Sequence, residues 1–217
     1  MPASMYSITS AERYLNFLFS RQKNIDLPVI PHHCTLCFLP DVIELMKERY
    51  AYHTLTLGVI NPMQLFFFYP HKKSAFAIAR GQHGAPMAAI QLEELIALGF
   101  SDFLVIGPAG HPTAKPQPDL HIGDIVLATR SWIFEGTSAH YKSSPFSLPA
   151  PETITHLVSA FEQLGLQYRK GDIATTDALY RETTVFVQEL LSHHVLAIEM
   201  ELSALFTVAH FYNKSLA

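Results

Sequence analysis

Two acidic residues bracket a methionine where a stretch typical of an apolar strand gives way to one typical of an apolar helix. The segment reads Glu199-Met200-Glu201. Glu201 is expected at the start of this helix, held by its free N–H groups and by the positive end of its dipole. A carboxylate placed there can accept two hydrogen bonds from neighbouring hydroxyls of a sugar. Helix capping is the competing interpretation, but two acids in a largely apolar stretch are hard to explain without a ligand.

A second polar cluster follows a predicted strand. From Thr175 to Glu182 it combines two threonines with an aspartate, a tyrosine and an arginine. Open α/β sheets bind ligands at the ends of their strands, so this cluster is a candidate binding segment. A helix N-cap followed by exposed charges explains the same residues about equally well.

A glycine-rich turn at residues 81–86 is a third candidate. Gly81 and Gly84 allow backbone N–H groups to approach an anion where the following helix begins. The spacing matches neither the Gly-Lys-Ser/Thr phosphate loop nor the dinucleotide-binding fingerprint. A tight strand-to-helix turn that binds nothing is the commoner meaning of such a pattern.

Cys34 and Cys37 have the spacing of a redox pair or of half a zinc site. No second cysteine pair is present, and residues three apart in a strand point to opposite faces. Metal or redox chemistry is therefore the weakest alternative, and we expect neither a metal nor a cofactor. Two cysteines also make no disulfide framework, which favours a reducing cytoplasm.

Hydrophobic periodicity and turn residues predict alternating strands and helices. Helices are expected at residues 10–21, 40–50, 87–98, 152–164, 183–192 and from 201 onward. Strands are expected at residues 35–38, 53–60, 64–69, 75–80, 103–106, 125–133, 172–175 and 195–198. This order indicates an α/β fold with a central mixed, largely parallel sheet flanked by helices. We expect one domain over residues 1–217, with an N-terminal helical extension of about residues 1–30.

Composition narrows the classes of function. Of the 217 residues, 49% are hydrophobic and 16% are charged, which supports a large buried core and excludes a disordered chain. The net charge of −4 gives no electrostatic reason to expect a nucleic-acid partner. No stretch approaches the roughly 20 apolar residues that span a bilayer, and the N-terminus does not resemble a signal peptide. We therefore expect a cytoplasmic protein that has no membrane partner.

The chain from about Cys34 onward resembles the nucleoside phosphorylase superfamily, which includes uridine phosphorylases and purine nucleoside phosphorylases. Five segments carry the resemblance in the same order: residues 84–99, 122–126, 135–141, 176–182 and 199–201. The resemblance implies the three-layer phosphorylase/hydrolase-like fold of that family. It also implies an enzyme that cleaves the N-glycosidic bond of a nucleoside, with phosphate as the acceptor, in a homo-oligomer (dimer or hexamer).

The resemblance further implies roles for the matching residues. Glu201 and Glu199 would be catalytic and, with Met200, would bind the ribose. The base would be bound by Thr176, Asp177, Leu179, Tyr180 and Arg181. The rest of the pocket would come from Thr137, Ser138 and His140. Phosphate would be bound by Gly84, Arg80, Gly107 and Ala109.

This sequence departs from the family pattern in two places. The turn at residues 105–110 has Val105 where the family commonly has an arginine, and Pro108 lacks an N–H group. The strand that commonly follows the last helix, with a Ser-Asp that can protonate a purine, is expected to be missing with the helix after it. Two alternatives therefore stay open: a nucleosidase that uses water, and a nucleoside-binding protein without catalysis.

Overall fold

A six-stranded sheet forms around β1 (His33–Cys37), whose apolar residues are buried on both faces. The computed structural model describes residues 8–21, 28–58, 62–71, 74–113 and 120–217. β1 runs parallel to β4 (Ser74–Arg80) and β5 (Asp102–Ile106), and β10 (Ser215–Leu216) runs parallel to β5. The antiparallel strands β3 (Met63–His71) and β2 (Ala51–Leu57) extend the sheet beyond β4.

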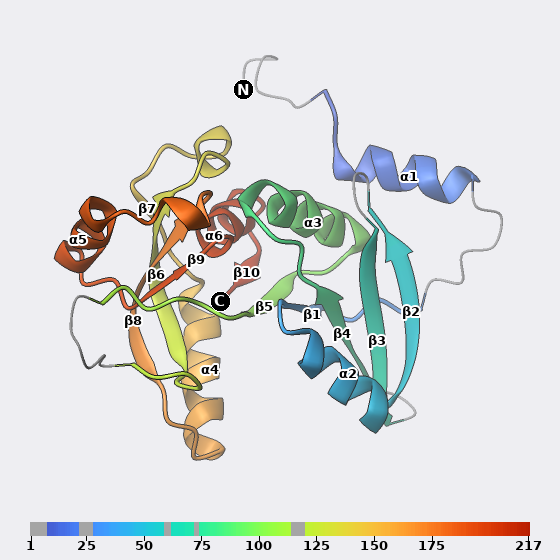
Figure 1. The fold of residues 1–217 in the computed structure, drawn as a ribbon. Coiled ribbons are helices and arrows are strands. Elements are labelled where there is room, and N and C mark those ends of the chain that lie inside the picture. Colours follow the sequence, from blue (N-terminus) through green and yellow to red (C-terminus); the bar gives the residue numbers. More distant parts are fainter. Residues whose placement is uncertain (1–7, 22–27, 59–61, 72–73, 114–119) are drawn as a thin grey trace.

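A second sheet of four strands has the order β7-β6-β8-β9. Its members are β7 (Phe146–Ser147), β6 (Val126–Phe134), β8 (Arg169–Thr176) and β9 (Ala197–Glu199). β6, β8 and β9 are parallel, and β7 is antiparallel to β6. Gly110 and Ile198 exchange two backbone hydrogen bonds of 2.8 Å, which connect the turn after β5 to β9. The two sheets therefore meet where β5 and β9 end, as Figure 1 shows between its right and left halves.

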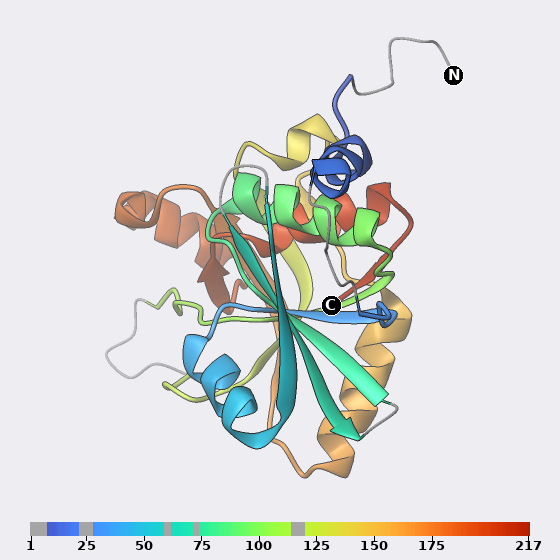
Figure 2. The same ribbon diagram turned by 90° about the vertical axis from the view of Figure 1, so that its right-hand side faces the viewer.

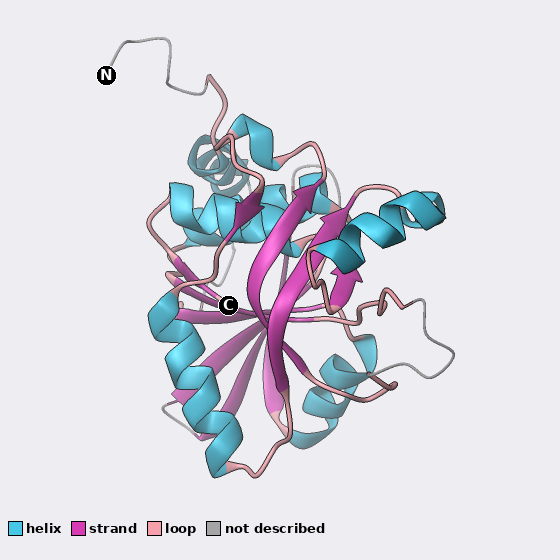
Figure 3. Ribbon diagram, turned by 90° about the vertical axis from the view of Figure 1, so that its left-hand side faces the viewer, coloured by secondary structure: helices cyan, strands magenta, loops and turns pink. Residues whose placement is uncertain are grey.

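Helices cover both sides of the strands (Figures 2 and 3). They are α1 (Ala11–Arg21), α2 (Pro40–Arg49), α3 (Ala85–Leu98), α4 (Pro151–Gln163), α5 (Thr184–Ser192) and α6 (Leu202–Phe211), with short 3-10 turns η2 (Ser138–His140) and η3 (Leu179–Arg181). α1, α3 and α6 share one core cluster with the inner face of the six-stranded sheet, whereas α2 packs on its other face. α1, α2, α3, α5 and α6 each bury apolar side chains, whereas α4 has no fully buried residue.

The mixed, mostly parallel α/β architecture predicted from the sequence is confirmed. The predicted helices and strands form within a few residues of their expected limits, with residues 59–60 of one strand and residues 1–7 and 22–27 of the extension outside the described residues. The sequence predicted no strand at β7 and none after α6, where Ser215–Leu216 adds β10 to the sheet. Two-residue strands carry too little periodicity to be recognised.

The two cysteines lie on opposite faces of β1, as their spacing predicted. Cys34 belongs to the core cluster beneath α1, α3 and α6, and Cys37 belongs to the cluster beneath α2. Burial raises the pKa of both thiols. Within the described residues no group of three or more His, Cys, Asp or Glu side chains is arranged to hold a metal ion. Likewise, no helix in the described part of the chain is long and apolar enough to cross a membrane.

Candidate active site

A cavity of about 770 Å³ opens where β5 and β9 end. Three segments form most of its wall: Val105 and residues 107–111 at the end of β5, residues 120–124 before β6, and residues 196–202 along β9. The wall also includes Phe38, His83, Val126, Ala128, Ile173 and Leu179. This volume falls within the range of small-molecule sites. The cavity also lies at the strand ends, where α/β sheets bind ligands.

Glu199 is held in place by both of its carboxylate oxygens. Oε1 accepts a hydrogen bond from the hydroxyl of Thr175, and Oε2 accepts from the backbone N–H groups of Glu201 and Leu202 at 2.6 and 2.7 Å. The acceptor of the free N–H groups at the start of α6 is thus Glu199. The sequence-based expectation that Glu201 would bind these groups is wrong, because the Glu201 side chain makes no capping hydrogen bond and turns towards α3.

Glu201 reaches across to the start of α3. Its Oε1 accepts a hydrogen bond of 2.6 Å from the N–H of Gly84 and lies 3.9 Å from Nδ1 of His83. The residue is 7% exposed and lines the cavity. The anion at the α3 N-terminus is therefore the carboxylate of Glu201, so the candidate anion-binding turn at residues 81–86 binds an acid of the protein itself.

Burial raises the pKa of both acids. It raises the pKa of Glu199 to about 7, against the opposing effect of its hydrogen bonds from Thr175, Glu201 and Leu202. Burial also raises the pKa of Glu201, against the hydrogen bond from Gly84 and the nearby His83. Two titrating carboxylates in one cavity are a feature of sites that perform chemistry.

A buried polar network fixes the side chain of Thr175, the residue that donates a hydrogen bond to Glu199. Thr175 Oγ1 accepts from the N–H of Ser203 at 2.8 Å and lies 2.9 Å from Ser131 Oγ. Ser203 Oγ in turn donates to Glu135 at 2.9 Å. Thr175, Ser131 and Ser203 have no exposed surface. Because each polar group in this network has a partner, the network can hold Glu199 in one orientation.

The structure brings some of the predicted residues together in the cavity. Glu199, Met200, Glu201 and Leu179 line it, as do Gly107 and Ala109. The other residues predicted for the base and the pocket do not: Thr176, Asp177, Tyr180, Arg181, Thr137, Ser138 and His140.

These remaining residues have other surroundings. Thr176 Oγ1 accepts from the N–H of Ala178, and Asp177 accepts from the N–H of Gly136 at 2.9 Å. Tyr180 is 95% exposed, and Arg181 is also exposed. In the second loop, Ser138 is buried against Thr207, Thr137 donates its N–H to Glu135, and His140 is exposed. Their proposed contacts with a substrate therefore stay predictions.

The residues predicted to bind phosphate are also dispersed. Arg80 lines a neighbouring hollow that shares only His83 with the main cavity. Phe38 covers both glycine turns: a Cβ on Gly81 would lie 2.6 Å from its ring, and one on Gly107 would lie 3.3 Å from its Cβ. The described residues that line the main cavity include neither lysine nor arginine. A dianion there would have to rely on backbone N–H groups and histidines.

The cavity wall also contains residues that were not predicted for the site, among them Phe38 and His111. Each stands at the end of a strand or in the turn after it, in loops that meet only in the folded chain. Their position after strands β1 and β5 was the signal that could have identified them.

Together, the fold and this cavity define an α/β protein with two acidic side chains, Glu199 and Glu201, in a cavity of small-molecule size at its strand ends. Residues 32–217 match the family model described as the phosphorylase superfamily. The chain belongs to this superfamily.

Named relatives agree with this assignment. The chain is 37% identical to a guanosine phosphorylase of Halorubrum lacusprofundi, over 58% of this chain and 51% of the relative. It is 32% identical to a uridine phosphorylase of Thermococcus kodakarensis, over 59% of this chain and 50% of the relative. The chain thus spans about half the length of these curated relatives.

A solved structure agrees in fold. The crystal structure of uridine phosphorylase from Vibrio fischeri ES114 superposes with a TM-score of 0.74 at 23% sequence identity. The match covers 87% of this chain and 77% of the other. This confirms the three-layer arrangement that the resemblance implied.

Proposed function

We propose that this chain cleaves the N-glycosidic bond of a nucleoside and transfers the ribosyl group to phosphate. The observation that carries the proposal is the pair Glu199 and Glu201, which flank Met200 in a cavity of about 770 Å³. Relatives named guanosine, uridine and purine nucleoside phosphorylases support the same reaction.

The chemistry of the bond fits this pair of acids. When the bond between ribose and base breaks, positive charge develops on the sugar, and fixed carboxylates stabilise it. Glu201 uses Oε1 for Gly84 and keeps acceptor capacity for the vicinal hydroxyls of ribose. Glu199 secures the start of α6 and therefore the position of Glu201. Leu179 and Met200 offer apolar surface to the base and the sugar.

A second candidate is hydrolysis, in which water replaces phosphate as the acceptor. It is favoured by the absence of lysine and arginine from the described cavity wall and by the cover that Phe38 forms over Gly81 and Gly107. A phosphate dianion is bound most strongly by paired cations, whereas water needs none.

One experiment separates these reactions. The purified protein is incubated with a panel of purine and pyrimidine nucleosides, with and without phosphate, and released base and ribose 1-phosphate are separated by chromatography. Phosphate-dependent release with equimolar ribose 1-phosphate is the expected result. Release without phosphate would identify a nucleosidase. Nucleoside binding without release would show that the chain only binds.

We also propose that the protein is a cytoplasmic homo-oligomer, a dimer or a hexamer. Leu179 and Ile122 line the cavity; Leu179 is 52% exposed and Ile122 is fully exposed, so two apolar side chains of the cavity wall are uncovered. Burial of such side chains against a second copy would be favourable. Light scattering coupled to size-exclusion chromatography should give a mass above that of one chain, and a monomer would contradict the proposal.

A further inference from the structure

His111 is fixed beside the same strand that carries the two acids. It directly follows Gly110, which is joined to Ile198 in β9 by two backbone hydrogen bonds. His111 Nδ1 lies 2.8 Å from the carbonyl oxygen of Leu196, the residue before β9. The half-buried side chain lines the cavity. Both backbone and side chain are therefore held against the cavity wall.

The partner of Nδ1 determines the tautomer of this imidazole. A carbonyl oxygen only accepts hydrogen bonds, so Nδ1 must carry its hydrogen. Nε2 is then the ring atom that can exchange a proton. A histidine held in this way can present either an acceptor or, when protonated, a second N–H to a molecule in the cavity.

The spacing of residues along β9 places His111 away from Glu199 and Glu201. Leu196 and Glu199 are three residues apart, which in extended backbone corresponds to about 10 Å. Under the proposed function, the ribose lies at the Glu199–Glu201 end of the cavity. The base, which is bonded directly to the ribose, would extend along β9 towards Leu196 and His111.

We propose that His111 is a catalytic residue, the general acid that protonates the leaving base. The proposal rests on the proposed function. As the bond between C1′ and the base nitrogen breaks, its electron pair moves onto the base. The proton of His111 Nε2 is transferred to the base, which leaves neutral and leaves a neutral imidazole. An oxygen of phosphate, or of a water molecule that releases a proton to solvent, forms the new bond to C1′, and His111 regains its proton from solvent.

Other proton donors of the cavity are less suited to this step. His83 lies beside Glu201, at the ribose end, and its side chain is 77% exposed. His121 lies 3.9 Å from Asp124, and its side chain is 74% exposed. Glu199 is surrounded by hydrogen-bond donors from Thr175 and α6. Among the titratable side chains that line the described cavity wall, His111 therefore combines a fixed orientation with a free ring nitrogen.

The test uses His111→Asn and His111→Gln, with His156→Asn as the control. An asparagine amide can keep a donor where Nδ1 stands, facing Leu196, but it has no acid at the place of Nε2. His156 lies on the exposed face of α4, outside the cavity. Each protein is assayed with the preferred nucleoside and with p-nitrophenyl riboside, whose leaving group departs as an anion and needs no proton.

We expect His111→Asn to lower kcat on the nucleoside by about 100-fold or more, the usual contribution of a general acid. Its kcat on p-nitrophenyl riboside should stay within about threefold of the unsubstituted protein, because no proton is needed there. Nucleoside binding, measured by calorimetry, should be retained.

Three results would overturn the proposal. Equal losses on both substrates would mean that His111 only maintains the structure, and His111→Gln, which lacks the donor to Leu196, would then lose more activity than His111→Asn, which keeps it. Full nucleoside activity in His111→Asn would exclude the acid role while the proposed function stands. Absence of base release by the unsubstituted protein would overturn the proposed function and this role with it.

Discussion

Glu199 and Glu201 are two residues apart, yet they have different tasks. Glu199 accepts hydrogen bonds from Thr175 and from the first N–H groups of α6, so it builds the corner between β9 and the helix. Glu201 bridges to Gly84 on α3 and faces the cavity. At this corner one acid positions the other, and substitution of each should affect a different property of the protein.

Replacement of Glu201 by alanine should remove nucleoside turnover while the protein stays folded. The substitution deletes the charged acceptor for the ribose hydroxyls, and each hydrogen bond to a charged group contributes about 1.5–3 kcal/mol. We expect kcat/KM to fall by at least about 100-fold, or roughly 2.7 kcal/mol. Steady-state kinetics measures the loss, and circular dichroism confirms the fold.

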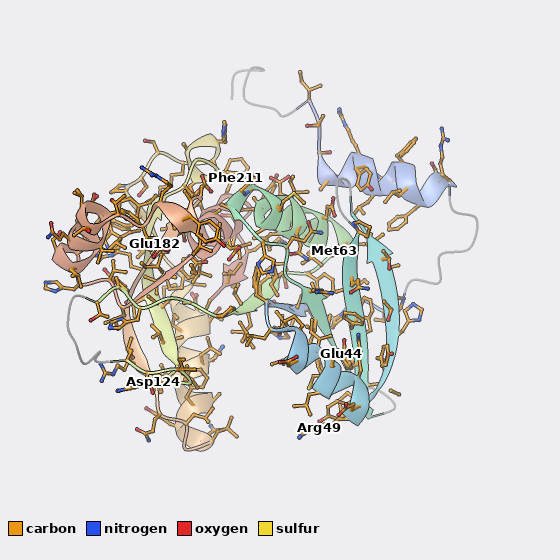
Figure 4. All side chains as sticks on the ribbon, in the orientation of Figure 1. Glu44, Arg49, Met63, Asp124, Glu182 and Phe211 are labelled. Atoms are coloured by element: carbon orange, nitrogen blue, oxygen red, sulfur yellow. The ribbon has the colours of Figure 1, made fainter. Side chains whose placement is uncertain are left out.

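Glu44→Ala is the matched control for this substitution. Glu44, labelled in Figure 4, is an exposed acid of α2 and does not line the cavity. It should leave kcat/KM unchanged within about twofold, as is usual for surface substitutions. Unaltered kinetics in Glu201→Ala would remove the main support for the site.

Titration of Glu199 should make the stability of the protein depend on pH. Its pKa rises from 4.5 to about 7 on folding, because it is buried. Between these values the folded chain keeps a proton that the unfolded chain has released, so the free energy of unfolding falls as the pH rises through this window. The change is about 3 kcal/mol at most. Burial of Glu201 acts in the same direction.

Urea unfolding at a series of pH values from about 4.5 to about 8 tests this prediction. Glu199→Gln cannot release a proton, so its free energy of unfolding should decline less over that window than that of the unsubstituted protein. A steeper decline in the variant would contradict the assignment of the titration to Glu199.

At the scale of elements, close packing of β8 against the start of β9 keeps the cavity wall in place. Gly171 of β8 has no room for a side chain, since a Cβ there would lie 2.2 Å from Cδ1 of Leu196. Gly171→Ala should therefore destabilise the protein by about 1–3 kcal/mol, as overpacking does. It should also displace Leu196, whose carbonyl holds His111. Chemical denaturation measures the first effect and base release the second.

A double substitution tests whether the contact with Leu196 causes the loss of stability in Gly171→Ala. Leu196→Ala removes the clashing atoms, so Gly171→Ala should cost less in that background, a coupling that a double-mutant cycle detects. Lys170→Ala, at an exposed neighbour in β8, is the neutral control. Purely additive effects would show that the contact between residues 171 and 196 does not limit packing.

The sequence predicts the elements better than it predicts their meeting points. The helix from Ala85 to Leu98 and the apolar strands β1 and β5 follow from periodicity and from Gly99, the left-handed residue that ends the helix. The two-residue strands β7 and β10 cannot be predicted in this way, because they are defined by pairing with a neighbouring strand and not by a local sequence pattern.

The site divides in the same way. Glu199, Met200 and Glu201 could be recognised because charge within an apolar stretch is visible in one segment. The sequence could not show which of the two acids turns towards α6. This depends on Gly84 and Thr175, which are 117 and 24 residues away from the acids that they bind. The position of Phe38 over the cavity could not be predicted for the same reason, because Phe38 packs against Gly81 and Gly107, which belong to two other turns.

At the scale of the whole molecule, α6 lies between the two sheets. Leu205, Phe206 and Val208 belong to the core cluster of the six-stranded sheet. Ser203, on the same helix, donates a hydrogen bond from its backbone N–H to Thr175 of the four-stranded sheet. A shared central helix should couple the unfolding of the two sheets, which is what the proposed single domain requires.

We therefore predict a single unfolding transition. Trp132, the chain's one tryptophan, is in β6 and its fluorescence reports on the four-stranded sheet. Its denaturation curve should coincide with that from far-ultraviolet circular dichroism, and the calorimetric and van't Hoff enthalpies should agree. Two separated transitions would divide the chain into two folding units.

The alternation of side chains along β1 gives the protein two internal reporters. Cys34 and Cys37 are free thiols buried on opposite faces of one strand, one beneath α1, α3 and α6 and the other beneath α2. A small alkylating reagent reacts with each only when its own covering layer opens. If α2 detaches before the main core loosens, Cys37 will be labelled ahead of Cys34, so mass spectrometry of the two peptides would give the order in which the faces of the sheet become exposed to water.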